Sequence, residues 1–450
     1  MRTFLALVCA VLLGIGPLVG QRRAGAAENA VAREIRVDIS QADAGGAGPR
    51  AIQAAIDRMA GLGGGTVRVG PGRCELRSAL TLRSNVRVIG NVPRKHAAPD
   101  TVLTSCGGAK TRLAQDAAQN TDRIVLADEA GFRVGDGVAI RDDRSSAGFA
   151  VTTATLAEKT GPKTFRLSAP LVQDYAVSRG GTVALVFPVV GGWNVHDATV
   201  EGLTIDGNRP RAEALDGCRG AGIYLYACQR VTVRNCTVRN CRGDGISFQW
   251  ASSGVTVEDC LVENCLVFGL HPGSDSHHSV MRRNRSIGNG GPGIFVCENV
   301  KHVVFEKNEL RGNQGPGISI GCRDSDNLFR ENTIIGNRAG GILFRDDGGE
   351  EKGAHRNVFE KNTVLDNGSL SKDNPLPACV SILGIHRDLV FRENTLGNSE
   401  GGGPRGTGIL VAGDAKGLID EANRFRNLKS EVDWGTRRGP LKPPTDPRSK

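Results

Sequence analysis

The sequence predicts an all-β fold, a solenoid of stacked rungs wound as a right-handed parallel β-helix. Three rows of residues recur in one phase at a period of about 24, which lies in the range of solenoid repeats. The first row runs Asn235, Asp259, Asn284, Asn308, Asn332. The second row, five residues later, runs Asn240, Asn264, Asn289, Asn313, Asn337. In the third row a glycine precedes an aliphatic residue, from Gly222-Ile223 to Gly341-Ile342.

Short apolar stretches between these rows alternate inward and outward residues, as in "VTVRNCTV" and "VTVEDCLV". None is long enough for a helix, and Gly and Asn separate them, so each rung is expected to hold two or three short strands. One rung cannot bury its own apolar side, so successive rungs must stack about 4.8 Å apart as parallel sheets. We expect the two Asn rows to be structural, with amides bonding between rungs and Asp259 interrupting the first row.

The cysteines follow the same period. Cys236 and Cys260 lie 24 residues apart, as do Cys241 and Cys265, so each pair is expected to stack in neighbouring rungs. That spacing is compatible with a disulfide, but a row of small buried apolar side chains is the simpler interpretation. The cysteines form no CxxC pairs and lie near no clustered histidines, so the sequence does not favour zinc.

Departures from the repeat divide the chain. Residues 1–26 combine Arg2, an apolar run and an Ala-x-Ala stretch, which predicts a signal peptide and a secreted or periplasmic protein; a single membrane anchor is the alternative. Residues 27–110 hold the first rungs and "RAIQAAIDRMAGLGGG", a helix expected to cap the open end. Residues 111–186 lack the rows and predict a small β-barrel-like insertion. The main β-helix is expected over 187–430, and a Pro-rich, basic, disordered tail over 431–450.

The N-terminal pattern "IQAAIDRMAGLGGGTVRVGPGRCEL…LTLRSNVRVIG" and the Gly-Ile and Asn rungs resemble the pectin-lyase-like β-helix superfamily. The resemblance covers about residues 65–105 and 187–430. It implies a protein that cleaves or modifies polysaccharides, particularly uronic-acid polymers, although some members are non-catalytic or are phage-tail adhesins. The motifs of polygalacturonases, calcium pectate lyases and mannuronan epimerases are missing, so no catalytic residue is carried over.

Candidate site residues come from the strands that follow each glycine. If the aliphatic residue points inward, the next residue points outward, and so does the third after the glycine. The first outward row is Tyr224, Ser247, His271, Phe295, Ser319, Leu343, and the second begins Tyr226, Gln249, Gly273. His271 is the predicted base or acid, with Asp244 about one rung away and Arg345 neutralising a substrate carboxylate. Substrate binding is assigned to Tyr224, Tyr226, Gln249, Trp250, Asp275, Glu298, Asp324 and Arg209.

These residues favour a lyase that acts on a uronic-acid glycan by β-elimination. A hydrolase is the first alternative, because adjacent rungs could place Asp244 and Asp275 about 5 to 9.5 Å apart. A non-catalytic glycan-binding or structural protein is the second. Asp244, Asp275 and Asp324 could also hold Ca²⁺, which prefers hard oxygen ligands. The scattered net charge of +9 predicts no nucleic-acid partner, and we expect a monomer with no membrane span after signal cleavage.

Overall fold

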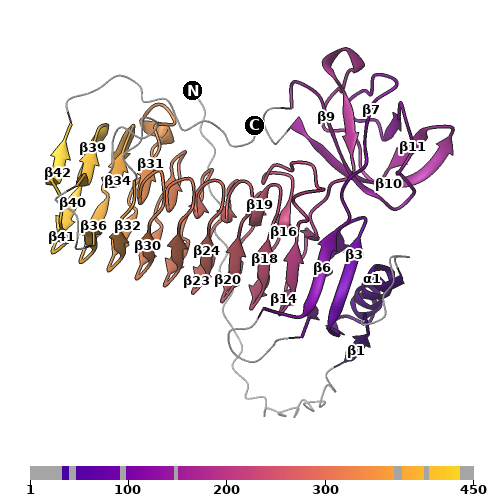
Figure 1. The fold of residues 1–450 in the computed structure, drawn as a ribbon, viewed down its shortest axis with the longest axis horizontal. Coiled ribbons are helices and arrows are strands. Elements are labelled where there is room, and N and C mark those ends of the chain that lie inside the picture. Colours follow the sequence, from indigo (N-terminus) through magenta and orange to yellow (C-terminus); the bar gives the residue numbers. More distant parts are fainter. Residues whose placement is uncertain are drawn as a thin grey trace, which may run out of the picture.

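The computed structural model describes residues 33–39, 47–91, 98–145, 150–368, 378–399 and 405–435. In that part the chain forms a right-handed parallel β-helix in which each full rung contributes one short strand to each of three parallel sheets (Figure 1). The solenoid and its rungs are therefore as the sequence predicts. The predicted signal peptide, residues 1–26, lies outside the described residues.

Sheet 1 contains β1 Glu34–Val37, β2 Gly65–Val69, β5 Val86–Ile89, β14 Thr199–Glu201, β17 Thr232–Arg234, β20 Thr256–Glu258, β23 Val280–Arg282, β26 Val304–Glu306, β29 Leu328–Arg330, β32 Val358–Glu360, β36 Val390–Arg392 and β40 Ile419–Glu421. Sheet 2 contains β3 Gly72–Leu76, β6 Thr101–Ser105, β15 Thr204–Asp206, β18 Thr237–Arg239, β21 Leu261–Glu263, β24 Arg285–Ile287, β27 Glu309–Arg311, β30 Thr333–Ile335, β33 Thr363–Leu365, β37 Thr395–Gly397 and β41 Arg424–Arg426.

Sheet 3 contains β4 Leu80–Thr81, β13 Val190–Trp193, β16 Ala221–Tyr226, β19 Asp244–Gln249, β22 Leu270–Pro272, β25 Ile294–Phe295, β28 Ile318–Ile320, β31 Ile342–Phe344, β34 Ala378–Ile382, β38 Thr407–Val411 and β42 Ser430–Trp434. A short pair, β35 Ile385–Arg387 and β39 Asp414–Lys416, lies beside the last rungs. The third row of the sequence is in register here: Ile223 pairs with Ile246, and Ile246 pairs with Leu270.

The core is a set of columns that run along the solenoid axis. In sheet 1, for example, Phe305 pairs with Phe329 and Phe329 with Phe359, and all three rings are fully buried and stacked 4.4 Å apart. Such columns arise because every inward position recurs once per rung. Most of the apolar burial therefore lies between neighbouring rungs.

The Asn rows need one correction. The interval from Asp259 to Asn284 is one residue longer than the repeat, and the structure shows that the row slips there. Asn235 and Asp259 occupy a left-handed turn position, φ 53° and 54°, that Arg283 takes in the next rung. The interior column instead begins with Cys236 and Cys260, and Cys260 N–H donates to Asn284 Oδ1 at 3.1 Å.

The second row slips in the same way, with Asn240 and Asn264 at the turn and Cys241 and Cys265 in the column. Cysteine fits the first rungs of both columns because its side chain is small and tolerates burial. The described cysteines are all free thiols. The hydrogen bond with Cys265 and burial raise the pKa of Cys241 well above its ordinary value, so this thiol is kept neutral.

The N-terminal helix α1, Ala47–Gly61, packs against the first rungs and caps this end of the solenoid (Figure 1). Its buried face carries Ile52, Ile56 and Met59, as the sequence predicts. No helix among the described residues is long and apolar enough to cross a bilayer.

The insertion forms a separate antiparallel sheet that projects beside the N-terminal rungs (Figure 1). Its strands, in order across the sheet, are β7 Lys110–Arg112, β12 Thr182–Ala184, β9 Gly137–Arg141, β10 Thr152–Gly161, β11 Thr164–Leu167 and β8 Arg123–Val125. A bridge between Leu113 and Leu126 joins the two edge strands, so the sheet closes into a small barrel. The barrel has its own core, which includes Phe165 and Tyr175.

The predicted start of the disordered tail is wrong. Residues 431–434 belong to β42, in which Val432 pairs with Ile409 of the preceding rung and packs on the core. A strand forms here because the last full rung still offers an unpaired parallel edge. Residues 436–450 lie outside the described part.

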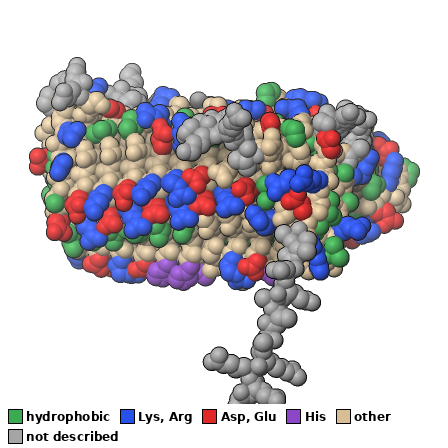
Figure 2. Space-filling view, turned by 90° about the horizontal axis from the view of Figure 1, so that it is seen from below, with side chains coloured by type: hydrophobic (Ala, Val, Ile, Leu, Met, Phe, Trp, Pro, Cys, Tyr) green, Lys and Arg blue, Asp and Glu red, His purple; other side chains and the backbone are tan. Residues whose placement is uncertain are grey.

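The outer surface carries a long stripe in which basic and acidic side chains alternate (Figure 2). Ion pairs between neighbouring rungs of sheet 1 and of the turn after it account for such alternation, for example Arg282 with Glu258 at 2.8 Å and Arg283 with Asp259 at 2.7 Å. In these pairs each charge has an opposite partner one rung away, so they are explained by stacking of the rungs.

Candidate functional site

The outward row predicted from the repeat exists, but it is covered. Tyr224, Ser247 and His271 pair in register across β16, β19 and β22 of sheet 3. Their exposed fractions are 1%, 0% and 2%. They are enclosed because residues 207–220, which connect β15 to β16, lie over them. We call residues 207–220 the cover segment.

His271 of this row forms a buried pair with Asp244, the first residue of β19. His271 Nδ1 lies 2.6 Å from Asp244 Oδ2. The other carboxylate oxygen, Oδ1, accepts a hydrogen bond from the Phe268 N–H at 3.2 Å. Both oxygens of the carboxylate are acceptors, so a neutral imidazole must carry its proton on Nδ1. This leaves the lone pair of Nε2 free to take a proton.

Aromatic rings and the cover segment enclose this pair. Phe268 and Phe295 stack on each other at 4.1 Å, and each meets the His271 ring at 5.2 Å, near a right angle. From above, Gly217 closes the site: a Cβ there would lie 1.7 Å from Asp244 Oδ2 and 2.7 Å from His271 Nδ1. Only glycine fits at this position, so the cover segment makes direct contact with the pair.

Hydrogen bonds hold the cover segment down. Ser247 Oγ donates to the Gly217 carbonyl at 2.9 Å, and the Tyr224 hydroxyl donates to the Cys218 carbonyl at 2.8 Å. Burial raises the pKa of Tyr224 far above its ordinary value, and the positive charge of Arg219 offsets part of this shift. Tyr224 is thus neutral and anchors the cover segment. The sequence suggested that its ring stacks on substrate, but the ring is buried.

Beside the covered pair lies an open pocket of about 320 Å³. It is lined by Cys218, Arg219, Tyr226, Gln249, Trp250 and Ser274. Tyr226 and Trp250 stack at 5.8 Å with their planes 9° apart, and half of Trp250 is exposed. Three predicted binding residues, Tyr226, Gln249 and Trp250, therefore meet in one pocket.

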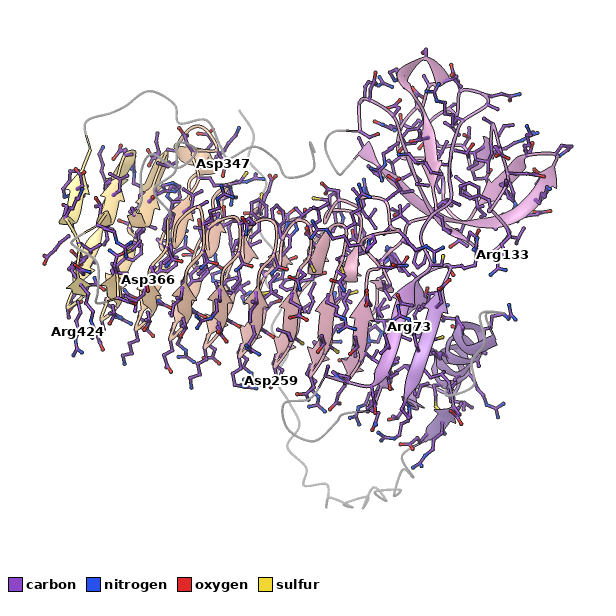
Figure 3. All side chains as sticks on the ribbon, viewed as in Figure 1. Arg73, Arg133, Asp259, Asp347, Asp366 and Arg424 are labelled. Atoms are coloured by element: carbon purple, nitrogen blue, oxygen red, sulfur yellow. The ribbon has the colours of Figure 1, made fainter. Side chains whose placement is uncertain are left out.

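Arg345 does not reach the His271–Asp244 pair. Its guanidinium lies 4.6 Å above the ring of Phe295, which separates it from His271. It donates to Ser319 Oγ and to the Val296 carbonyl, both at 3.0 Å, and it lies 3.3 Å from Asp347. Asp347 projects from the loop after β31, well away from Asp259 on the opposite edge (Figure 3). Arg345 is thus engaged by the protein's own groups.

The predicted calcium ligands are not gathered. Asp244 is occupied by His271, whereas Asp275 is exposed and accepts a hydrogen bond from Asn299. Asp324 is fully buried and accepts from the Val300 and Gly321 N–H groups at 2.9 and 3.1 Å. Burial raises the pKa of Asp324 to about 7. Within the described residues no group of three or more His, Cys, Asp or Glu side chains is arranged to hold a metal.

Two further predicted binding residues also lie apart from the pocket. Glu298 forms an ion pair with Arg323. Arg209 is exposed and contacts the Asn264 carbonyl, 3.4 Å away, on a turn of the neighbouring sheet. Sequence reasoning missed Gly217, Cys218 and Arg219, since the stretch "DGCRG" belongs to no repeat and only its glycines hint at the close approach that Gly217 makes.

The fold and the site together define a right-handed parallel β-helix protein with a buried Asp–His pair beside an aromatic pocket on sheet 3. The family model described as "Right handed beta helix region" matches residues 190–350 and 298–429, which together make up more than half of the chain. The chain belongs to this family. A search of curated proteins found no match.

Solved structures show the same architecture at low sequence identity. The A-module of the mannuronan C-5 epimerase AlgE4 of Azotobacter vinelandii is 16% identical with a TM-score of 0.55, over 86% of this chain and 93% of that one. The AlgE6 A-module of the same organism is 17% identical with a TM-score of 0.51, over 85% and 93%. ORF18 of Geobacillus virus E2 is 11% identical with a TM-score of 0.51, over 88% and 62%. These similarities establish the fold.

Proposed function

We propose that the protein is a carbohydrate-active enzyme that acts on a uronic-acid glycan, with His271 as the base that removes a proton from a sugar carbon. The observation that carries the proposal is the buried pair: His271 Nδ1 is held 2.6 Å from Asp244 Oδ2. Asp244 orients the imidazole and stabilises the imidazolium that forms when Nε2 takes up a proton. In a row otherwise used for packing, such a pair has no structural counterpart in neighbouring rungs.

The reaction that suits this pair is β-elimination. His271 Nε2 takes the C5 proton, which the adjacent carboxylate makes acidic; the C–H electron pair becomes the C4–C5 double bond, and the C4–O bond breaks. The leaving oxygen takes a proton from the His271 imidazolium or from water and gives a new chain end. The cover segment must lift for a sugar to reach the pair, because His271 is only 2% exposed and Gly217 lies against Asp244 Oδ2 and His271 Nδ1.

Two observations bear on the alternatives. The Azotobacter modules are named C-5 epimerases, and epimerisation also begins with removal of a C5 proton. A hydrolase that uses Asp244 with Asp275 is less compatible, because Asp244 begins β19 whereas Asp275 follows the far end of β22. Elimination is therefore our first candidate, and epimerisation through the same base is the second.

The test is a panel of uronic-acid polysaccharides incubated with wild-type protein and with His271→Ala. Ultraviolet absorbance of unsaturated uronates reports elimination, and solvent deuterium incorporated at C5 without absorbance reports epimerisation. We expect one of these in the wild type and neither in His271→Ala. His302→Ala, an exposed histidine on a turn beside sheet 1, is the matched control. Activity that persists in His271→Ala, or reducing ends released without absorbance, would contradict the proposal.

A further inference from the structure

The pocket beside the covered pair has features that point to a ligand of its own. We propose that it is a subsite for one pyranose ring of an acidic glycan, with Tyr226 and Trp250 against the ring face and Gln249 bonding a hydroxyl group. The claim that this subsite belongs to an active site around His271 rests on the proposed function. The binding itself can be measured separately.

A left-handed turn after β19 presents the aromatic wall. Trp250 and Ala251 have φ values of 58° and 56°, which bulky and β-carbon-bearing residues rarely adopt. The turn is kept in place because Ser252 Oγ donates to the Gln249 carbonyl and the Ala251 N–H donates to the Ser274 carbonyl, both at 2.8 Å. Left-handed backbone recurs at the same turn in neighbouring rungs, at Ala227 and at Asp275, φ 53° and 61°, so the repeat sets the turn and the sequence places a tryptophan on it.

Trp250 on this turn is the end of a cluster of ring-bearing residues that suit sugars. The chain has three Trp and three Tyr, and two of each are joined ring to ring. The cluster consists of Trp193, Tyr224, Tyr226 and Trp250, with neighbouring centroids 5.8 to 6.4 Å apart. Its exposed end is Trp250, stacked on Tyr226 at the pocket. An extended aromatic face with a polar rim is the surface on which the C–H face of a pyranose packs.

Gln249 supplies the polar partner. It is 1% exposed, its Nε2 donates to Ser247 Oγ at 2.8 Å, and its Oε1 has no partner among the described residues. An unpaired buried oxygen is costly, and a ligand hydroxyl removes that cost. The carboxamide lies over Gly273, where a Cβ would come within 2.5 Å of Oε1, so glycine leaves the room this side chain needs to turn toward the pocket.

Charge on the opposite wall favours an acidic sugar. Arg219 lines the pocket, and its positive charge acts on the Tyr224 hydroxyl and the Cys218 thiol. The acids that act on Cys218 are Asp244, which is paired with His271, and Glu298, which is paired with Arg323. A uronate carboxylate is therefore recognised better here than the hydroxymethyl group of a neutral hexose.

The pocket is also connected to the cover segment. Cys218 and Arg219 belong to this segment, directly after Gly217. Ser247 Oγ accepts from Gln249 Nε2 and donates to the Gly217 carbonyl, so one chain of hydrogen bonds joins the pocket to the cover over His271. A sugar that turns Gln249 breaks this chain, and occupancy of the subsite thereby loosens the cover.

Binding is tested in His271→Ala of the full chain, which removes turnover. The probes are mannuronate and galacturonate tetrasaccharides and their carboxyl-reduced, neutral forms, measured by calorimetry. We expect one uronate probe to bind, Trp250→Ala to weaken it by at least about tenfold, and the neutral form to bind more weakly. Trp434→Ala removes another exposed tryptophan, in the last strand of sheet 3, and is the matched control that leaves affinity unchanged. Arg219→Gln should reduce the preference for the acidic probe.

The outcomes separate the subsite from the proposed reaction. Unchanged affinity in Trp250→Ala, or no binding by any probe, overturns the subsite even if the wild type converts polysaccharide. Equal affinity for acidic and neutral probes overturns its acidic specificity. Trp250-dependent binding without turnover by the wild type supports the subsite and contradicts the proposed reaction. Melting temperatures of all variants show that a loss of binding is not a loss of folding.

Discussion

The interior Asn column and the His271–Asp244 pair both bury polar groups in the solenoid, but they satisfy them differently. In the column, Asn308 Oδ1 accepts from the Asn284 N–H, and its Nδ2 donates to the Met281 carbonyl and to Asn332 Oδ1, all within 2.9 to 3.0 Å. The rungs above and below supply these partners at every step. The histidine pair has no such repetition and needs a segment from outside the repeat to cover it. Buried polarity that the repeat does not explain is thus the better guide to function.

The largest effect is expected at Asp244. Asp244→Asn keeps the shape of the pair, but the amide has one acceptor oxygen and donates from its nitrogen, so the imidazole loses its fixed tautomer. We expect kcat/KM on the converted glycan to fall roughly a thousandfold. Asp259→Asn, an exposed acid paired with Arg283, is the matched control and should retain full activity. Equal rates for the two variants would show that the pair is structural.

In the column the expected effect is on stability. Asn308→Ala removes the acceptor of the Asn284 N–H. It also removes the donor to the Met281 carbonyl and to Asn332 Oδ1, and all of these groups are buried. Unpaired buried groups of this kind lower the free energy of unfolding by about 3 kcal/mol in total. Denaturant titration measures this loss, with Gln314→Ala, an exposed amide in the same rung, as control. Activity per folded molecule should not change, in contrast to Asp244→Asn. A variant as stable as the control would mean that the column contributes little.

The same comparison explains what the sequence could predict. Regular features followed from the period: the rungs, the inward columns and the outward row with His271. The apolar face of α1 followed from helical spacing. The slip at Asn284 was missed because asparagine suits both a left-handed turn and an interior column, so residue type alone does not separate them. The proximity of Asp244 to His271 followed from rung spacing. The placement of Arg345 and the cover segment did not, because loop side chains choose partners that no repeat specifies.

Gly217 tests whether the cover is as tight as the geometry indicates. Gly217→Ala places a methyl group against Asp244 and His271, so either the pair separates or the cover segment lifts. Overpacking of this kind costs about 2 kcal/mol. We expect faster hydrogen exchange in residues 207–220 and a lower melting temperature. Gly61→Ala, where no atom lies within 4 Å of the new Cβ, is the control. Unchanged exchange would show that the segment yields without cost and does not enclose the pair.

Asp324 shares a property with each region. It is buried and hydrogen-bonded like the asparagines of the column, and it is titratable like His271 and Asp244. Its pKa rises to about 7 in the folded protein, chiefly through burial, from the ordinary carboxyl value of 3.8. The folded state therefore holds more protons than the unfolded state between these values, and stability falls as pH rises through this window. Between pH 6 and 7 this carboxyl should cost about 1 kcal/mol, with little further change above pH 8.

Asp324→Asn cannot titrate, so it should lack this part of the pH dependence whatever its absolute stability. The unfolding free energies of wild type and variant are measured at steps from pH 4 to pH 8. As pH rises, the wild type should lose stability relative to the variant. Asp326→Asn is the control, since the hydrogen bond from Arg356 lowers the pKa of that carboxyl instead. A constant difference between wild type and Asp324→Asn across the series would mean that Asp324 stays ionised. Arg345 would then hold the buried charge, and Asp324 would belong with the ion-paired surface rather than with the neutral column.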